Sequence, residues 1–186
     1  MGGQPIEFPV EGLSDGVVRL RLMAEADLPA IVAACQDPEI PRWTRVPETY
    51  GESEARSWFE QEAEQRARGE QLGLVIVDPG SGRLEGSVGI VRFDSQEGRC
   101  ELGYWTARDS RGRGLATRAV RLLSGWAFEH LPIDRIEIHA EPENAASRRV
   151  AERAGFRFEG VLRSYLVNKG VRRDAASYSL LRGELR

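Results

Sequence analysis

The sequence predicts a single domain of mixed α/β (α+β) class. At 186 residues, the chain is long enough for one substantial hydrophobic core. Its apolar share of 41% and its charged share of 30% are ordinary for a globular protein. Segments that alternate apolar and polar residues are interspersed with segments that repeat apolar residues at helical spacing. Their order is a β-meander first and a β-α-β-α-β arrangement later.

Each element follows from a local pattern and a boundary signal. Residues 1–14 have no periodicity and are expected to form a flexible lead-in to a domain over residues 15–186. Residues 39–50 contain two prolines and are predicted to form an ordered loop. Seven segments are predicted to be strands: 17–22, 72–77, 84–93, 99–106, 134–140, 158–162 and 174–181. Four segments are predicted to be helices: 27–35 after a cap at Asp27, 53–68 after a cap at Ser53, 115–130 after the glycine turn, and 144–154 after a cap at Asn144.

A stretch rich in glycine and arginine, Arg111 to Ala116, lies between a predicted strand and the longest amphipathic helix. Residues 108–121 contain five arginines and one acidic residue, although the whole protein has a net charge of −3. The first peptide N–H groups of a helix lack intrahelical partners, and the helix dipole favours an anion there. Gly112 and Gly114 would let a ligand approach the backbone closely. The stretch predicts a phosphate site; the alternative is an ordinary helix start with a solvated basic face.

The spacing of this stretch excludes two familiar nucleotide sites. A dinucleotide fingerprint needs a third glycine where this chain has Thr117, and it belongs near the start of a βαβ unit. A nucleotide P-loop ends in Gly-Lys-Ser/Thr, which this chain lacks. The residues alone therefore predict a pyrophosphate-like anion at a strand–turn–helix junction.

Composition argues against several other classes of protein. The net charge of −3 argues against nucleic acid as the main partner. Cys35 and Cys100 are far apart in the sequence, and the two histidines lie in different predicted elements, so neither a disulfide nor a metal site is expected. No stretch approaches the ~20 apolar residues of a membrane-spanning helix. We expect a soluble cytoplasmic protein with no metal and no membrane partner.

The second half of the chain, read as a whole, resembles a known family. The motifs are Leu102-Gly103-Tyr104-Trp105-Thr106, Arg111-x-x-Gly114-x-Ala116, Asn144-x-x-Ser147 and Gly155-Phe156. In this order they resemble the GNAT superfamily of N-acetyltransferases, and more narrowly its RimJ/RimL-type branch, whose members acetylate N-termini of ribosomal proteins. The resemblance implies one domain with a central, mostly antiparallel, twisted sheet of about seven strands, splayed at the middle and flanked by about four helices.

The resemblance also implies acetyl-CoA as co-substrate. The glycine-arginine turn would bind its diphosphate, and the splayed strands would pair with the pantetheine arm like an added strand. The 3′-phosphate could meet Arg111, Arg113, Arg148 or Arg149, and the sequence does not choose among them. The expected cofactor-binding residues are Tyr104, Trp105, Thr106, Arg111, Gly112, Arg113, Gly114, Leu115, Ala116, Thr117, Asn144 and Ser147.

The catalytic residues are predicted less directly. Asn144 and Ser147 share one face of a helix start, and by themselves they are typical of simple capping. The resemblance implies that Ser147 donates a proton to the leaving thiolate. Some members of the branch have a glutamate at a position that matches about Leu166, where this chain has no carboxylate. Glu101 is then the candidate base, or equally a structural carboxylate paired with an arginine, and Tyr104 is a further candidate.

The sequence gives only indirect evidence for the acceptor amine. Trp43, Arg42 and Tyr50 lie in the predicted loop over the site and are candidate substrate-binding residues, although aromatic residues there could equally fasten the loop to the core. Without a clear base, an α-amine with a pKa near 8 is easier to deprotonate than a lysine. The expected function is acetyl-CoA-dependent transfer to a primary amine, such as a protein N-terminus. The alternatives are a small-molecule amine acetyltransferase and a non-catalytic acyl-CoA-binding module. Members of the branch often form dimers, so a homodimer is a further expectation.

Overall fold

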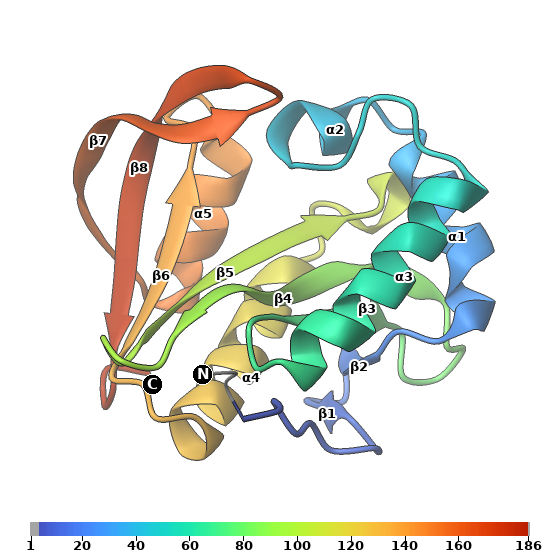
Figure 1. Ribbon diagram of the computed structural model, residues 1–186, viewed down its shortest axis with the longest axis horizontal. Coiled ribbons are helices and arrows are strands. Elements are labelled where there is room, and N and C mark those ends of the chain that lie inside the picture. The colour runs from blue at the N-terminus through green and yellow to red at the C-terminus, as the bar shows by residue number, and fades with distance from the viewer. Residues whose placement is uncertain (1–3, 186) are drawn as a thin grey trace.

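One mixed sheet organises the molecule (Figure 1). The computed structural model describes residues 4–185. The eight strands within that range are β1 (Leu13–Ser14), β2 (Arg19–Leu22), β3 (Leu72–Val77), β4 (Leu84–Asp94), β5 (Arg99–Thr106), β6 (Arg135–Ala140), β7 (Arg157–Asn168) and β8 (Val171–Leu181). The five α-helices within it are α1 (Leu28–Cys35), α2 (Glu39–Trp43), α3 (Glu52–Ala67), α4 (Leu115–His130) and α5 (Ala145–Ala154). Two 3₁₀ turns, η1 (Glu25–Asp27) and η2 (Arg108–Ser110), precede α1 and α4.

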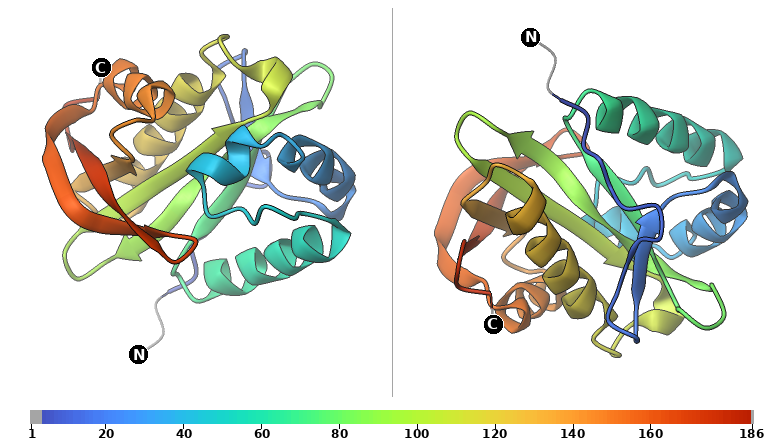
Figure 2. Two further views of the ribbon diagram at one scale, coloured as in Figure 1. Left: turned by 90° about the horizontal axis from the view of Figure 1, so that it is seen from above. Right: turned by 90° about the horizontal axis from the view of Figure 1, so that it is seen from below.

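The sheet is mostly antiparallel, as expected. Its strand order is β1-β2-β3-β4-β5-β6-β8-β7, and only the β5–β6 pair is parallel. Helices α1, α2 and α3 lie on one face of the sheet, and α4 and α5 lie on the other (Figure 2). The mixed class is therefore confirmed, with one more strand and one more helix than the patterns predicted. Among residues 4–185, none of the helices combines the length and apolar content that crossing a membrane would need.

The larger of two apolar cores lies between α4 and the sheet. Helix α4 buries Leu115, Ala119, Leu123 and Trp126, which recur on one face at helical spacing. The segment expected to be a flexible lead-in contributes to this core, because Ile6 and Phe8 are also buried in it. The Phe8 ring packs edge-on against Trp126, with ring centroids 5.0 Å apart. Burial of each such large apolar side chain stabilises the fold by roughly 1.5–3 kcal/mol.

The predicted loop over residues 39–50 contains a short helix. Helix α2 begins after Pro38 and includes Pro41 in its first turn, where the missing proline N–H would have no intrahelical partner in any case. The start of α3 also differs from the prediction. Its cap is Gly51 rather than Ser53, and the Glu54 carboxylate accepts a hydrogen bond of 2.8 Å from the Gly51 N–H.

Strand β7 is more than twice the predicted length of five residues. It runs from Arg157 to Asn168 and pairs with β8 through two register shifts. Ser164 lies within the second shift and has a φ of 54°, a left-handed value that is uncommon outside glycine. These irregularities interrupt the two-residue alternation from which strands are predicted, so the sequence pattern indicated only the first part of β7.

The parallel pair β5–β6 separates part of the way along its length. The residues in register are Arg99 with Arg135, Cys100 with Ile136 and Glu101 with Glu137. Beyond Glu101, β5 continues to Thr106 and β6 continues to Ala140 without further pairing to each other. The splay that the resemblance implied is therefore present at the middle of the sheet, between these two strands.

An ion pair across three strands makes the stability of the fold pH-dependent. Arg135 Nη1 on β6 donates to Glu159 Oε1 on β7 at 2.9 Å, and Ser179 on β8 donates to the same oxygen at 2.7 Å. These contacts, Arg135 first, lower the pKa of Glu159 to about 2 from 4.5. A lowered folded-state pKa stabilises the fold above the unfolded-state pKa, and that contribution is lost as the pH falls through the folded-state pKa.

We therefore expect Glu159→Gln to lower the free energy of unfolding at pH 7. The change should be less than about 1 kcal/mol, because the Glu159 side chain is 41% exposed and water screens the pair. Urea titrations from pH 7 to pH 2 should show the difference from wild type shrinking between about pH 4.5 and pH 2. A difference that stays constant over this range would show that the charge of Glu159 is not responsible.

Candidate functional site

The glycine-arginine turn forms an open loop at the start of α4. Gly112 and Gly114 have φ values of 75° and 76°, which favour glycine, and Gly114 is the N-cap of the helix. A Cβ built on either glycine would meet no atom within 4 Å. The first peptide N–H groups of α4 therefore open toward a space that an anion can enter. Leu115 buries its side chain in the core, so only its backbone belongs to this loop.

The splay between β5 and β6 opens into a cleft of about 840 Å³. Several of the residues expected to bind the cofactor line it together: Tyr104, Trp105, Thr106, Arg111, Ala116, Asn144 and Ser147. Side chains alternate along β5, so Leu102 and Tyr104 face the core beneath α4, whereas Glu101, Gly103 and Trp105 face the side of α3. The cleft thus reaches both faces of the sheet.

A hydrogen-bonded pair joins β5 to α5 beside the splay. The Tyr104 hydroxyl donates to the Ser147 carbonyl at 3.0 Å and lies 2.9 Å from Ser147 Oγ. Burial raises the pKa of the Tyr104 phenol, which keeps its proton in the neutral pH range. Asn144 is the N-cap of α5, and its Oδ1 accepts a 3.0 Å hydrogen bond from the Ser147 N–H. The capping interpretation of Asn144 is therefore correct, and Asn144 also lines the cleft.

Glu101 lies at the point where the two strands part. Its Oε2 is 3.5 Å from His139 Nδ1 on β6 and 3.6 Å from Arg92 on β4. Burial alone would raise the pKa of Glu101, but the His139 ring and the charges of Arg92 and Arg45 lower it overall. Glu101 is thus ionised at neutral pH. It has the arginine partner expected of a structural carboxylate, and it also lines the cleft, while its role as a base stays a prediction.

His139 was not among the predicted catalytic or binding residues. Its side chain is 2% exposed, lines the cleft and packs against Tyr165, with ring centroids 4.9 Å apart. Its Nδ1 has no hydrogen-bond partner among the described residues. The sequence did contain a signal for this position. Ile138 and Ala140 on either side of it are apolar and buried, and Ile138 belongs to the core beneath α4, so the alternation along β6 turns the His139 ring to the other face of the sheet.

Of the three expected substrate-binding residues, two line the cleft and one lies outside it. Trp43 and Tyr50 line the cleft, and the Trp43 indole N–H donates to Glu39 at 3.0 Å. Arg42 lies outside the cleft, with its guanidinium 4.6 Å from the centre of the Trp43 ring. Tyr50 is also buried in the smaller core, which agrees with the fastening role for this aromatic residue. Leu166 lines the cleft too, so the position without a carboxylate does face the site.

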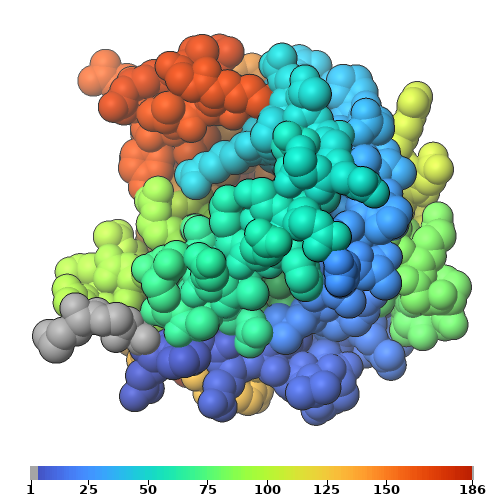
Figure 3. Space-filling model, turned by 45° about the vertical axis from the view of Figure 1, so that its right-hand side comes forward, coloured from blue at the N-terminus to red at the C-terminus, as the bar shows by residue number. Residues whose placement is uncertain are grey.

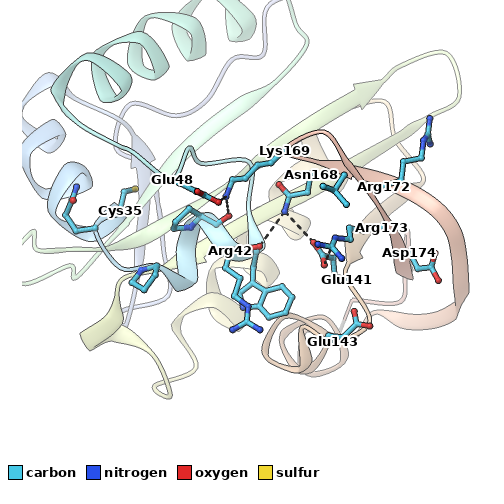
Figure 4. Close-up of a pocket in the computed structure, with 15 residues that line it drawn as sticks. Cys35, Arg42, Glu48, Glu141, Glu143, Asn168, Lys169, Arg172, Arg173 and Asp174 are labelled. Atoms are coloured by element: carbon cyan, nitrogen blue, oxygen red, sulfur yellow. Dashed lines mark hydrogen bonds and ion pairs between the residues drawn. The ribbon is translucent and has the colours of Figure 1, made fainter.

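The tip of the β7–β8 hairpin closes over the cleft and touches α2. Lys169 donates to the Pro41 carbonyl, and Asn168 lies 3.5 Å from the Arg42 carbonyl and 3.4 Å from a Glu141 carboxylate oxygen (Figure 4). Figure 3 shows the orange-red hairpin meeting the cyan segment of α2 at the upper edge of the face that carries α3. A second, polar groove of about 1040 Å³ lies along this contact and is lined by Arg42, Glu143 and Arg173, among others.

The loop arginines are tied to carboxylates on neighbouring elements. Arg111 pairs with Asp37 at 2.7 Å, and Arg113 pairs with Glu85 at 3.1 Å. Glu85 is 2% exposed, and its Oε2 also accepts a hydrogen bond from Ser110. Glu85 thus positions the turn that precedes α4. Its signal in the sequence was a carboxylate at the second position of a mostly apolar strand. Of the other arginines considered for the 3′-phosphate, Arg148 donates to the Tyr178 hydroxyl at 3.0 Å.

The fold and this cleft define the class of the protein. Residues 18–157 match the acetyltransferase (GNAT) domain family, and the chain belongs to that family. A relative in Bacillus subtilis (strain 168), "Putative ribosomal N-acetyltransferase YdaF", is 36% identical over 137 residues, 74% of this chain and 72% of the relative. A relative in Bacillus licheniformis, "Uncharacterized N-acetyltransferase p20", is 30% identical over 165 residues, 89% of this chain and 93% of the relative.

Solved structures of similar proteins have the same fold. Mycobacterium smegmatis RimJ, in complex with CoA-disulfide, is 27% identical, with a TM-score of 0.81 over 91% of this chain and 84% of its own. The microcin C7 self-immunity acetyltransferase MccE, in complex with acetyl-CoA and AMP, is 23% identical, with a TM-score of 0.84 over 94% of this chain and 98% of its own. At that identity the second similarity concerns the fold alone. Together with the family match, these findings establish an acetyl-CoA-dependent acetyltransferase with RimL/RimJ-type neighbours.

The residues present fit acetyl-CoA. The open cradle at Gly112 and Gly114 suits a diphosphate, since neither glycine has a neighbour where a side chain would lie. The unpaired edges of β5 and β6 offer N–H and C=O groups to the amides of the pantetheine arm. Among residues 4–185, no three His, Cys, Asp or Glu side chains are grouped in a way that could hold a metal ion.

Proposed function

We propose that this enzyme transfers the acetyl group of acetyl-CoA to a primary amine, and that the N-terminal α-amine of a protein, such as a ribosomal protein, is its acceptor. The observation that carries the proposal is the cleft at the β5–β6 splay, which is lined by Arg111 and Ala116 on either side of the open glycine loop and by the Tyr104–Ser147 pair. The names of YdaF and of the RimJ structure support the acceptor. We further propose that the enzyme acts in the cytoplasm, where its two unpaired thiols stay reduced.

In this proposal the donor is held by backbone groups and activated by two hydroxyls. The N–H groups at the start of α4 bind the diphosphate, and the unpaired β5 edge from Tyr104 to Thr106 binds the pantetheine arm and stabilises the oxyanion. Ser147 donates a proton to the departing thiolate. The Tyr104 hydroxyl, protonated at neutral pH, orients Ser147 Oγ from 2.9 Å.

The charge state of the acceptor amine follows from the groups that face it. The pKa of Glu101 is lowered, so it is a weak base, and Leu166 offers no carboxylate. An α-amine with a pKa near 8 needs roughly 1 kcal/mol to lose its proton at pH 7, whereas a lysine near 10.4 needs about 4 to 5 kcal/mol. A site with such weak general-base assistance favours the α-amine.

Homodimer formation stays a prediction.

An acceptor panel tests the proposal. Purified enzyme is incubated with acetyl-CoA and either short peptides with unblocked N-termini, the same peptides with blocked N-termini and a free lysine, or small mono- and polyamines. Release of free thiol measures turnover, and mass spectrometry locates the acetyl group. We expect acetylation of the α-amine and little of the lysine. Turnover restricted to small amines would identify a small-molecule acetyltransferase, and acetyl-CoA binding without any turnover would indicate a binding module.

A further inference from the structure

The floor of the cleft on the α3 side is a row of glycines. Gly73 on β3 is directly opposite Gly89 on β4, and Gly89 is directly opposite Gly103 on β5. All three line the cleft. Residues that face each other across neighbouring strands point to the same side of the sheet, so this row forms a strip of the cleft floor across three strands, called the slot below. The Leu72 carbonyl lies against Gly89 and the Val91 side chain lies against Gly103, so a ligand would run over these atoms rather than between them.

The Glu62 carboxylate occupies one end of this slot. Glu62 lies on the sheet-facing stripe of α3, one turn after Trp58, at a position where an apolar residue is expected. A Cβ on Gly73 would lie 2.3 Å from Glu62 Oε2, so the carboxylate fits only because residue 73 is a glycine. The glycine row begins beneath Glu62 and ends at β5.

This carboxylate is incompletely paired. Glu62 Oε1 accepts a 3.3 Å hydrogen bond from the Trp58 indole N–H, but Oε2 is buried and has no partner among the described residues. Burial raises the pKa of Glu62, although the Trp58 N–H, the Gly73 backbone and Arg66 act against it. A buried carboxylate oxygen without a partner costs stability, so a ligand that supplies a donor there would bind favourably.

The distance along the slot defines the ligand. Gly73 and Gly103 are separated by two strand spacings, roughly 10 Å. In the proposed function the acetyl group reacts beside β5, so Glu62 is too distant to be its base. We infer that Glu62 binds a second positive charge of the acceptor, an ammonium or guanidinium group roughly 10 Å from the reacting amine. This inference rests on the proposed function and narrows its substrates to acceptors with two cationic groups.

Matched acceptor pairs test this inference. One pair is Ser-Lys-Ala amide and Ser-norleucine-Ala amide; the other is 1,6-diaminohexane and hexylamine. The wild-type enzyme should favour the doubly charged member of at least one pair about 10-fold or more in kcat/KM, through KM. The pair that shows the preference identifies the source of the second charge, a peptide side chain or a small diamine.

Two variants should remove the preference by different routes. Glu62→Gln keeps the shape of the side chain and removes its charge, whereas Gly73→Ala places a methyl group where the carboxylate lies and displaces it. Both should bring the preference within about 2-fold of unity. Neither should weaken acetyl-CoA binding, which is measured by calorimetry. Glu60→Gln, on the exposed side of the same helix, and Gly125→Ala, in α4, serve as matched controls and should keep the preference.

The outcomes separate this inference from the proposed function. Equal turnover of both members of each pair by the wild type, or a preference that survives in Glu62→Gln, overturns the role of Glu62 while the acetyltransferase activity stands. Acetyl-CoA binding without turnover of any amine overturns the proposed function itself. Loss of acetyl-CoA binding in Glu62→Gln would show that the residue acts structurally, and would overturn the inference as well.

Discussion

Gly114→Glu should abolish acetyl-CoA binding. The N-cap position of α4 has a φ of 76° and open space around it, so the new side chain would fit and would place its carboxylate at the proposed diphosphate site. Two unit charges 4 Å apart near a protein surface repel by about 4 kcal/mol, and the diphosphate carries more than one charge. We expect the dissociation constant, measured by calorimetry, to rise more than about 100-fold.

Two controls separate the charge from backbone strain. Gly114→Ala adds only the strain of a left-handed residue, about 1 to 2 kcal/mol, and should lower the melting temperature while binding stays within about 10-fold. Gly82→Glu changes a glycine with a φ of 72° and equally open space in the β3–β4 turn. It should lose similar stability and bind acetyl-CoA normally. Normal binding by Gly114→Glu would refute the assignment of this loop.

Ser147→Ala should slow turnover and leave acetyl-CoA affinity intact. The variant loses the hydroxyl that is proposed to protonate the thiolate, and a well-placed general acid contributes at least about 100-fold to the rate. The cap of α5 should survive, because Asn144 Oδ1 accepts from the backbone N–H of residue 147 rather than from its side chain. Steady-state kinetics should therefore show kcat lowered about 100-fold, and calorimetry should show an unchanged dissociation constant.

Tyr104→Phe provides the companion measurement. It removes the hydroxyl that lies 2.9 Å from Ser147 Oγ, and it should lower kcat by less than Ser147→Ala does. If the two residues act as one unit, the double variant should be no slower than Ser147→Ala alone. Ser95→Ala, in the exposed turn between β4 and β5, controls for serine replacement. Full activity in Ser147→Ala would remove this serine from the mechanism.

The residues of the proposed donor half could be brought together from the sequence because their signals are local. Gly112, Gly114 and the helix after them are contiguous, and Asn144 and Ser147 are one turn apart on α5. Such patterns need no knowledge of which strands are neighbours. Periodicity also predicted seven of the eight strands and four of the five α-helices, although β7 and β8 are longer than the predicted segments.

The proposed acceptor half could not be predicted because it depends on register. The Glu62 carboxylate lies where a side chain on residue 73 would otherwise be, so its position depends on Gly73. The slot also requires Gly73, Gly89 and Gly103 to be opposite one another on three strands. No sequence period indicates such an alignment. In the same way, the contact of Lys169 with α2 depends on the irregular course of β7, whose register shifts are invisible in the alternation of residues.

The splay between β5 and β6 has a consequence for how the enzyme can diversify. The cleft reaches both faces of the sheet, and the proposed donor groups lie toward α4 and α5 while the proposed acceptor groups lie toward α2 and α3. The two reactants can then enter from opposite sides, so both can be bound at once. Changes on α2, α3 and the glycine row would alter which amine is accepted without disturbing the donor, so new specificities can arise on one side of an unchanged catalyst.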